Sequence, residues 1–261
     1  MTMIVSVLGS GSRGNTTFIR TESTRILIDA GLSRKELSRR LASIGEDPNG
    51  VDVVLVTHEH NDHAAGLKTL VKDLSIRVFL TAGTRRAMRA NDIPLNGSTL
   101  TDVTPGVAFQ AGDAEITPFA VPHDAAEPVA FSISSGGARV TQLTDTGHIP
   151  NSVAEYLKGT NLLILESNHD LEMLRVGPYP WSLKQRLLGR YGHLSNTGVA
   201  QFIREQFDGT ASNLMLAHLS EKNNHPAVAR QESLKAMRDC GHKTSVTLTS
   251  QQEPTTPIRI S

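Results

Sequence analysis

Cysteine is nearly absent from this chain: of 261 residues, only Cys240 is a cysteine. A single cysteine cannot form an internal disulfide, which favours a reducing compartment over a secreted protein. The sequence also lacks an apolar run of about 18 residues, the length that a membrane-spanning helix needs. Residues 1–8 alternate like a first strand and carry no basic start of a signal peptide. We therefore expect a cytoplasmic protein that makes no contact with a membrane.

The chain also has no net charge at pH 7, because its 26 Lys and Arg residues are balanced by 26 Asp and Glu residues. Proteins that cover the phosphates of duplex DNA are usually basic, so binding of that kind is disfavoured. Local basic clusters remain, at residues 34–40, 85–89 and 184–190, and each is expected to be a solvated helix face. Aromatic residues make up 4% of the chain, whereas it has ten histidines. Histidine chemistry is thus the informative feature of the composition.

Strand-length apolar runs alternate with helical patterns along the chain. We expect strands at residues 1–8, 26–29, 51–56, 76–80, 116–121, 129–133, 140–143, 162–165 and 214–217. A helix should begin at Ser33, which has Glu36 at capping-box spacing, and others fit near residues 83–90, 151–158, 181–190, 196–207 and 226–239. This alternation predicts one α/β domain over residues 1–250, followed by a surface tail at 251–261.

A dense group of metal-ligand side chains follows the apolar strand at residues 51–56. His58, His60, Asp62 and His63 form an H-x-H-x-D-H pattern. Neutral imidazole and carboxylate suit zinc, and also manganese or iron. Four such groups within six residues do not easily bind one tetrahedral ion. The pattern therefore favours two ions side by side over a polar surface turn that has histidines by chance.

Further candidate ligands stand where other strands end. His123, Asp145 and His218 each come directly after an apolar run or one to two residues later. A lone histidine at such a place is usually structural, but three independent cases of ligand type favour a metal site. Asp29 also follows an apolar strand, where an aspartate commonly caps a turn.

These motifs, in this order and at strand ends, resemble the metallo-β-lactamase superfamily from Gly9 to about His225. The resemblance implies a four-layer αββα sandwich, in which two mixed β-sheets have helices on the outside. It further implies that the protein binds two divalent ions, either zinc or manganese, with iron as a further option. The first ion would be held by His58, His60 and His123, the second by Asp62, His63 and His218, with Asp145 bridging and Asp29 orienting a ligand histidine.

Three further segments resemble the YycJ/WalJ type within that superfamily, which is related to PhnP-type phosphodiesterases. They are residues 8–15, residues 166–180 and residues 192–196 with 219–224. This resemblance implies a phosphodiesterase, plausibly a 5′ exonuclease acting on single-stranded DNA ends. Asp62, His193 and His169 are the candidate catalytic residues, since an imidazole can bind phosphate or donate a proton. The short stretch between Asp145 and His218 leaves no room for the large inserted domain of RNase J-type nucleases.

Other functions remain open at this stage. The same ions could serve a small-molecule cyclic phosphodiesterase, or a hydrolase of thioesters or lactams. A protein with purely structural ions is disfavoured, because structural zinc sites are usually cysteine-rich and hold one ion. The sequence leaves open the native metal, the strand polarity and the oligomeric state.

Overall fold

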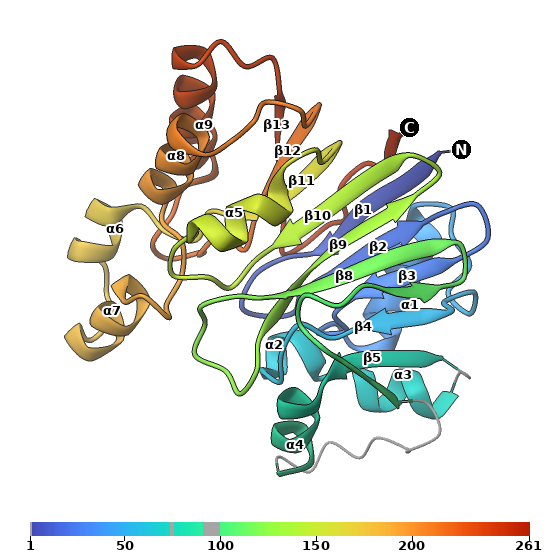
Figure 1. Cartoon of the computed structure of the whole chain (residues 1–261). Coiled ribbons are helices and arrows are strands. Elements are labelled where there is room, and N and C mark those ends of the chain that lie inside the picture. Colours follow the sequence, from blue (N-terminus) through green and yellow to red (C-terminus); the bar gives the residue numbers. More distant parts are fainter. Residues whose placement is uncertain (1, 74–75, 91–99) are drawn as a thin grey trace. The chain divides into compact units, whose positions relative to one another are not determined.

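The computed structural model describes residues 2–73, 76–90 and 100–261 of the chain (Figure 1). Two compact units make up the chain. The first comprises residues 1–120, 125–138 and 250–261, and the second comprises residues 121–124 and 139–249. Within the described ranges no helix is long and apolar enough to cross a membrane.

The first unit contains a sheet of seven strands in the order β14-β1-β2-β3-β4-β5-β6. These strands are β1 (Met3–Gly9), β2 (Thr16–Arg20), β3 (Arg25–Ile28), β4 (Val53–Leu55), β5 (Arg77–Thr81), β6 (Leu100–Val103) and β14 (Ile258–Ile260). Strands β3 to β6 are parallel, and β1 pairs antiparallel with both β2 and β14. The unit also holds the antiparallel strands β7 (Phe109–Ala111), β8 (Ala114–Ala120) and β9 (Val129–Ser135).

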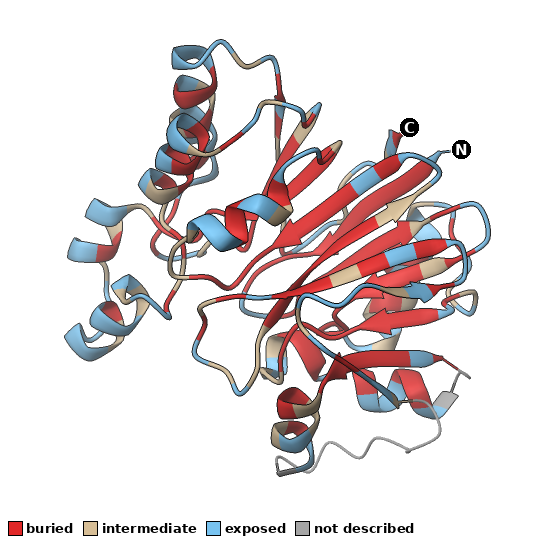
Figure 2. Cartoon of the chain, viewed as in Figure 1, coloured by how far each residue is buried: buried red, intermediate tan, exposed pale blue. Residues whose placement is uncertain are grey.

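Among the described residues of this unit, four helices accompany the strands: α1 (Arg34–Ser43), α2 (Asn61–Ala64), α3 (Leu67–Asp73) and α4 (Ala82–Ala90). The expected cap of α1 is present, because the Ser33 side chain accepts a hydrogen bond from the Glu36 amide. Central strands β3 and β4 are almost entirely apolar and buried, as parallel strands covered on both faces usually are (Figure 2). Their side chains pack with those of α1 and α3 in one core that includes Leu27, Leu41, Val54 and Leu70.

The second unit is built on four parallel strands, β10 (Ala138–Leu143), β11 (Leu162–Glu166), β12 (Asn213–Ala217) and β13 (Ser245–Leu248). Its helices are α5 (Asn151–Leu157), α6 (Leu171–Val176), α7 (Trp181–Leu188), α8 (Asn196–Glu205) and α9 (Pro226–Asp239). Parallel strands have their carboxyl ends at one edge of the sheet, which is where α/β proteins build sites. Asp145, Glu166 and His218 lie at the carboxyl ends of β10, β11 and β12.

The strands fall into two mixed sheets with helices beside them, one made of β1–β6 and β14 and the other of β7–β13, which confirms the predicted fold class. The expected strands and helices are present with ends shifted by a few residues, apart from Met1, which lies outside the described residues. Residues 251–261, expected to be a surface tail, instead include the edge strand β14, whose Ile-Arg-Ile alternation pairs with β1. Gln251 is buried there and accepts a hydrogen bond from the amide of Arg13.

Candidate metal centre

The histidine motif of the first unit lies on a tight turn that leads from β4 into the short helix α2. His60 is the residue before α2, and its carbonyl accepts the amides of His63 and Ala64. This turn brings three imidazoles together: the ring of His58 lies 4.5 Å from that of His60 and 4.2 Å from that of His63. Nε2 of His58 and Nδ1 of His60 are 3.0 Å apart. The sequence pattern thus becomes one compact group of nitrogen donors.

Asp29 contacts this group through His63. Its buried carboxylate accepts hydrogen bonds from Nδ1 of His63 at 2.7 Å and from the amide of Thr57 at 2.8 Å. Burial raises the pKa of Asp29 above its usual value, and the contacts with His63 and Thr57 offset this only in part. Because Nδ1 of His63 is directed at Asp29, Nε2 is the ring nitrogen that faces Asp62 and Asn15 and would serve a metal. The orienting role considered for Asp29 therefore has a geometric basis in its contact with His63.

Asn15 also contacts the histidine group, although nothing in the sequence marked it as a site residue. Its side-chain nitrogen lies 3.0 Å from Nε2 of His63 and 3.1 Å from Oδ2 of Asp62. Its backbone amide donates to the carbonyl of Asp62 at 2.7 Å. The glycine-rich segment from Gly9 to Asn15 was interpreted chiefly as a strand connection. In the fold it also ties down the α2 turn.

Gly31 allows the chain to pass this turn closely. A Cβ at this position would lie 1.8 Å from the carbonyl oxygen of Asp62 and 2.6 Å from the amide nitrogen of Asn15, both backbone atoms. We expect Gly31→Ala to lower the free energy of unfolding by at least about 2 kcal/mol, because the α2 turn must move. Urea denaturation measures this, and an unchanged transition midpoint would show that the turn yields at little cost.

Glu166, at the end of β11, organises the second unit's donors. Its Oε1 accepts from Nδ1 of His193 at 2.7 Å and from Nδ1 of His218 at 2.9 Å. Its Oε2 accepts the amides of Thr146 and Leu194, each at 3.0 Å. Burial by itself raises the pKa of Glu166, but the two histidines outweigh it and hold that pKa well below the usual range. The fully buried carboxylate is therefore ionised and has every acceptor site used.

Asp145 joins the same group. Its Oδ1 lies 3.1 Å from Nδ1 of His218 and 3.7 Å from Nδ1 of His193. Asp145, Glu166, His193 and His218 each offer a ligand-type atom within 4.8 Å of the others. Sequence analysis had singled out three of these residues, but it gave Glu166 no role. Its position at the end of a buried apolar strand was the available signal.

Three of the residues at these strand ends have a left-handed backbone. They are Asp29 with φ 61°, Asp145 with φ 59° and His218 with φ 56°, and no other described non-glycine residue has a positive φ. This conformation is costly for residues with a Cβ and gathers at functional sites. All three strained residues were already candidate site residues in the sequence.

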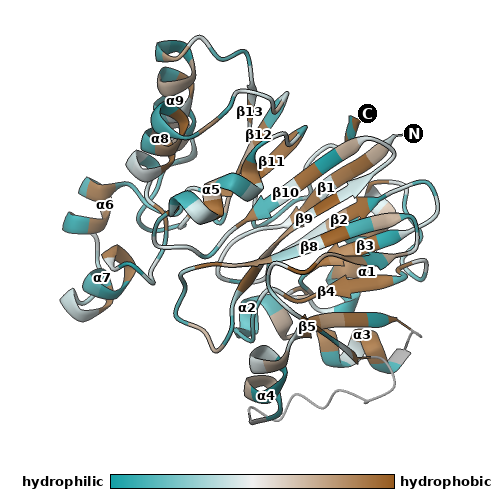
Figure 3. Ribbon diagram, in the orientation of Figure 1, coloured by the Kyte–Doolittle hydropathy of each residue, from teal (hydrophilic) through white to brown (hydrophobic). Residues whose placement is uncertain are grey.

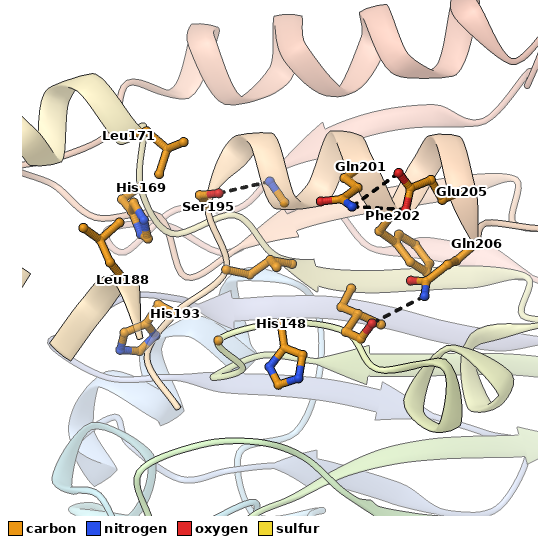
Figure 4. Close-up of a pocket in the computed structure, with 14 residues that line it drawn as sticks. His148, His169, Leu171, Leu188, His193, Ser195, Gln201, Phe202, Glu205 and Gln206 are labelled. Atoms are coloured by element: carbon orange, nitrogen blue, oxygen red, sulfur yellow. Dashed lines mark hydrogen bonds between the residues drawn. The ribbon is translucent and has the colours of Figure 1, made fainter. Parts of the chain in front are cut away.

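His123 lies next to His193 in the second unit. Its Nδ1 donates to the carbonyl of Gly192 at 3.3 Å, and its ring is 5.3 Å from that of His193. His193 is part-exposed and lines a cavity of about 340 Å³ (Figure 4). The segments on either side are held by a buried network in which Asn196 and Asn224 bond each other and Ser167. These asparagines, which had no assigned role, anchor the loops that carry His169 and His193.

His169 lines the same cavity and is 1% exposed. Its carbonyl accepts the amide of Asn196 at 2.9 Å, but its Nδ1 has no hydrogen-bond partner among the described residues. Burial lowers the pKa of His169 to about 4. The ring is therefore neutral at pH 7 and presents one unused nitrogen.

The depressed pKa of His169 predicts a pH-dependent stability. Between about pH 4 and pH 6.5 the unfolded chain binds a proton that the folded protein rejects, so stability rises with pH across this window. The expected gain is about 3 kcal/mol, complete above pH 6.5. We expect His169→Asn to flatten the slope of urea stability against pH over this range. Parallel curves for the two proteins would contradict the assignment.

Comparison with known proteins agrees with this geometry. Residues 24–219 match the family model described as a beta-lactamase superfamily domain. The chain is 36% identical to an exodeoxyribonuclease YycJ of Bacillus anthracis, over 90% of this chain and 89% of that protein. It is 34% identical to an exodeoxyribonuclease WalJ of Streptococcus pneumoniae, over 84% of this chain and 82% of the relative.

Solved structures share the fold at low sequence identity. The metallo-beta-lactamase fold protein YhfI from Bacillus subtilis superposes with a TM-score of 0.72 at 18% identity, covering 98% of this chain and 99% of that one. A diphosphatase from the PhnP family gives a TM-score of 0.67 at 17% identity, covering 100% of this chain and 98% of that one. The chain is thus a member of the metallo-β-lactamase superfamily, in the family of the YycJ and WalJ proteins.

Proposed function

We propose that this protein is a metal-dependent phosphodiesterase that removes nucleotides from the 5′ ends of single-stranded DNA. The observation that carries the proposal is the group held by Glu166, in which His193, His218 and Asp145 lie within 4.8 Å. The exodeoxyribonuclease names of the two relatives support a DNA substrate. We further propose that both units act as one functional domain over residues 1–250, located in the cytoplasm.

The donor types in each unit fit divalent metal ions. His58 contacts the hydroxyl of Thr57 through Nδ1, and His63 contacts Asp29 through Nδ1, so both rings offer Nε2. His218 contacts Glu166 through Nδ1, so its ring also offers Nε2. We propose zinc or manganese as the ions, with ligands divided as the family resemblance implies: His58, His60 and His123 for one, Asp62, His63 and His218 for the other, and Asp145 shared. Two bound divalent ions supply an activated water and neutralise charge on a phosphodiester.

His193 is proposed as the residue that meets the reacting phosphodiester. Its Nδ1 is directed at Glu166, and this contact fixes the orientation of the ring. The free Nε2 can then contact a phosphate oxygen or protonate the leaving oxygen. His169, buried and neutral in the same cavity, is proposed to position the substrate. Asp62 is proposed both as a ligand and as a carboxylate acting on the attacking water.

A panel of substrates tests the proposed function. We expect the purified protein to hydrolyse bis(p-nitrophenyl) phosphate with Mn²⁺ or Zn²⁺, and to lose this activity after treatment with a chelator. A chromogenic cephalosporin should remain intact. Trimming of a 5′-labelled single-stranded oligonucleotide should be faster than opening of a ribose cyclic phosphate. Cleavage of the cephalosporin alone, or of the cyclic phosphate alone, would overturn the proposal.

A further inference from the structure

Exposed apolar side chains gather on one part of the second unit, residues 171–191, which we call the α6–α7 arm. Five of the seven large apolar residues that are exposed within the described ranges lie there: Leu171, Val176, Trp181, Leu188 and Tyr191. Figures 2 and 3 show α6 and α7 as largely exposed helices with hydrophobic positions on them. Contiguous exposed apolar surface usually marks an interaction site.

The aromatic residues of the arm are unusual for this chain. Trp181, the chain's one tryptophan, is 63% exposed, and Tyr191 is 64% exposed. By contrast, Phe18 and Phe131 are fully buried in the core. A flat aromatic face open to solvent can stack on any nucleobase, which is how proteins bind single strands without reading their sequence.

The arm is also basic, although the whole chain is neutral. It carries four cations, Arg175, Lys184, Arg186 and Arg190, against the single carboxylate Glu172. The exposed ion pairs of Arg175 with Glu172 and of Arg186 with Asp124 are of a kind that contributes little stability. Arginines in such pairs can exchange their partner for a phosphate. The arm therefore joins stacking surface with charge complementary to a nucleic-acid backbone.

Several contacts hold the arm in place. The Asp170 side chain caps α6 at the amide of Met173, and the Asp170 amide donates to the carbonyl of Asn223. Lys184, which is 8% exposed, donates from α7 to the carbonyl of Arg175 in α6 at 2.7 Å. These bonds anchor both helices, so the aromatic side chains are displayed by a structured scaffold.

The arm continues into the cavity that contains the candidate catalytic histidine. Leu171 and Leu188 line this cavity together with His169 and His193 (Figure 4). Tyr191 stands two residues before His193, and its carbonyl accepts the amide of Asp124. A partner protein seated permanently on the arm would cover Leu171 and Leu188, which belong to the cavity wall. The occupant that suits both features is the substrate itself.

We propose that the α6–α7 arm is a stacking platform for single-stranded DNA. Bases stack on Trp181 and Tyr191, phosphates contact Arg186 and Arg190, and the strand is led toward His193. This inference rests on the proposed function, and it adds the surface that selects single strands. Because stacking needs unpaired bases, the platform favours a single strand over a duplex.

The sole tryptophan makes the proposal directly measurable. Metal-loaded protein is titrated with a short thymine oligonucleotide whose phosphorothioate linkages resist hydrolysis, and Trp181 emission is recorded. We expect saturable quenching by this oligonucleotide, with no quenching by the matched abasic oligonucleotide, which has the same charges without bases. A blunt duplex should not quench either.

Variants test the platform by anisotropy of a labelled oligonucleotide. Trp181→Leu and Tyr191→Ala should each raise Kd about tenfold. Val176→Ala, at a residue that is even more exposed but has no aromatic face, should leave Kd unchanged. Equal binding of thymine and abasic strands, or an unchanged Kd in both aromatic variants, would overturn the proposal. So would a shift of Trp181 emission with protein concentration alone, which indicates a second copy on the arm.

Experiments can distinguish a failure of the proposed phosphodiesterase activity from a failure of the proposed stacking platform. Wild-type hydrolysis of bis(p-nitrophenyl) phosphate without base-dependent binding would remove the platform and keep the phosphodiesterase. Base-dependent quenching without hydrolysis of any phosphodiester would keep the platform and remove the activity.

Discussion

Replacing His193 by alanine is expected to lower the turnover of a phosphodiester by about 100- to 10,000-fold while metal content stays near that of the wild type. The reason is that His193 lines the cavity with Nδ1 bound to Glu166, so Nε2 is the nitrogen that would contact the phosphodiester in the proposed role. The measurement is kcat for bis(p-nitrophenyl) phosphate together with elemental analysis of the purified variant.

Metal content separates the two roles that the geometry of His193 allows. His193 belongs to the donor group with Asp145 and His218, so loss of an ion in the variant would make it a ligand. A matched control is His225→Asn, which replaces an exposed histidine that caps α9 with another good capping residue. We expect this control to retain both turnover and metal.

Glu166→Gln is expected to lower both the stability and the turnover of the protein strongly, although the two side chains are nearly equal in size. In either orientation, the amide nitrogen of glutamine would face two N–H groups, those of Thr146 and Leu194 or those of His193 and His218. Buried donors then lose their acceptor, which should cost about 2–5 kcal/mol of unfolding free energy. Turnover should fall about 100-fold or more, because both histidines lose the group that orients them.

Urea denaturation and kcat, measured where the variant is still folded, test this expectation. The control is Glu172→Gln on α6, whose exposed carboxylate forms an ion pair with Arg175. This variant should change stability by no more than about 0.5 kcal/mol. If Glu166→Gln matched this control in both measurements, Glu166 would not be the organising carboxylate of the second unit.

Local patterns in the sequence were sufficient for most of the longer strands and helices and for the histidine motif. Apolar runs predicted strands β3, β4 and β11, and the Ser33–Glu36 spacing predicted the start of α1. Both signals depend on residues near each other in the chain, so they can be read without knowing the fold. Strand β14 escaped because it is three residues long and forms only by pairing with β1.

The sequence alone also determined which residue types stand at strand ends, and through them the family and the candidate donors His58, His60, Asp62, His63, His123, Asp145 and His218. Only the tertiary structure decided what those donors touch. Glu166 gained its role because parallel pairing of β10, β11 and β12 places three carboxyl ends at one edge. Asn15 gained its role because Gly31 permits close passage of the α2 turn. Contacts of this kind join distant residues through strand register and backbone approach, which no local pattern encodes.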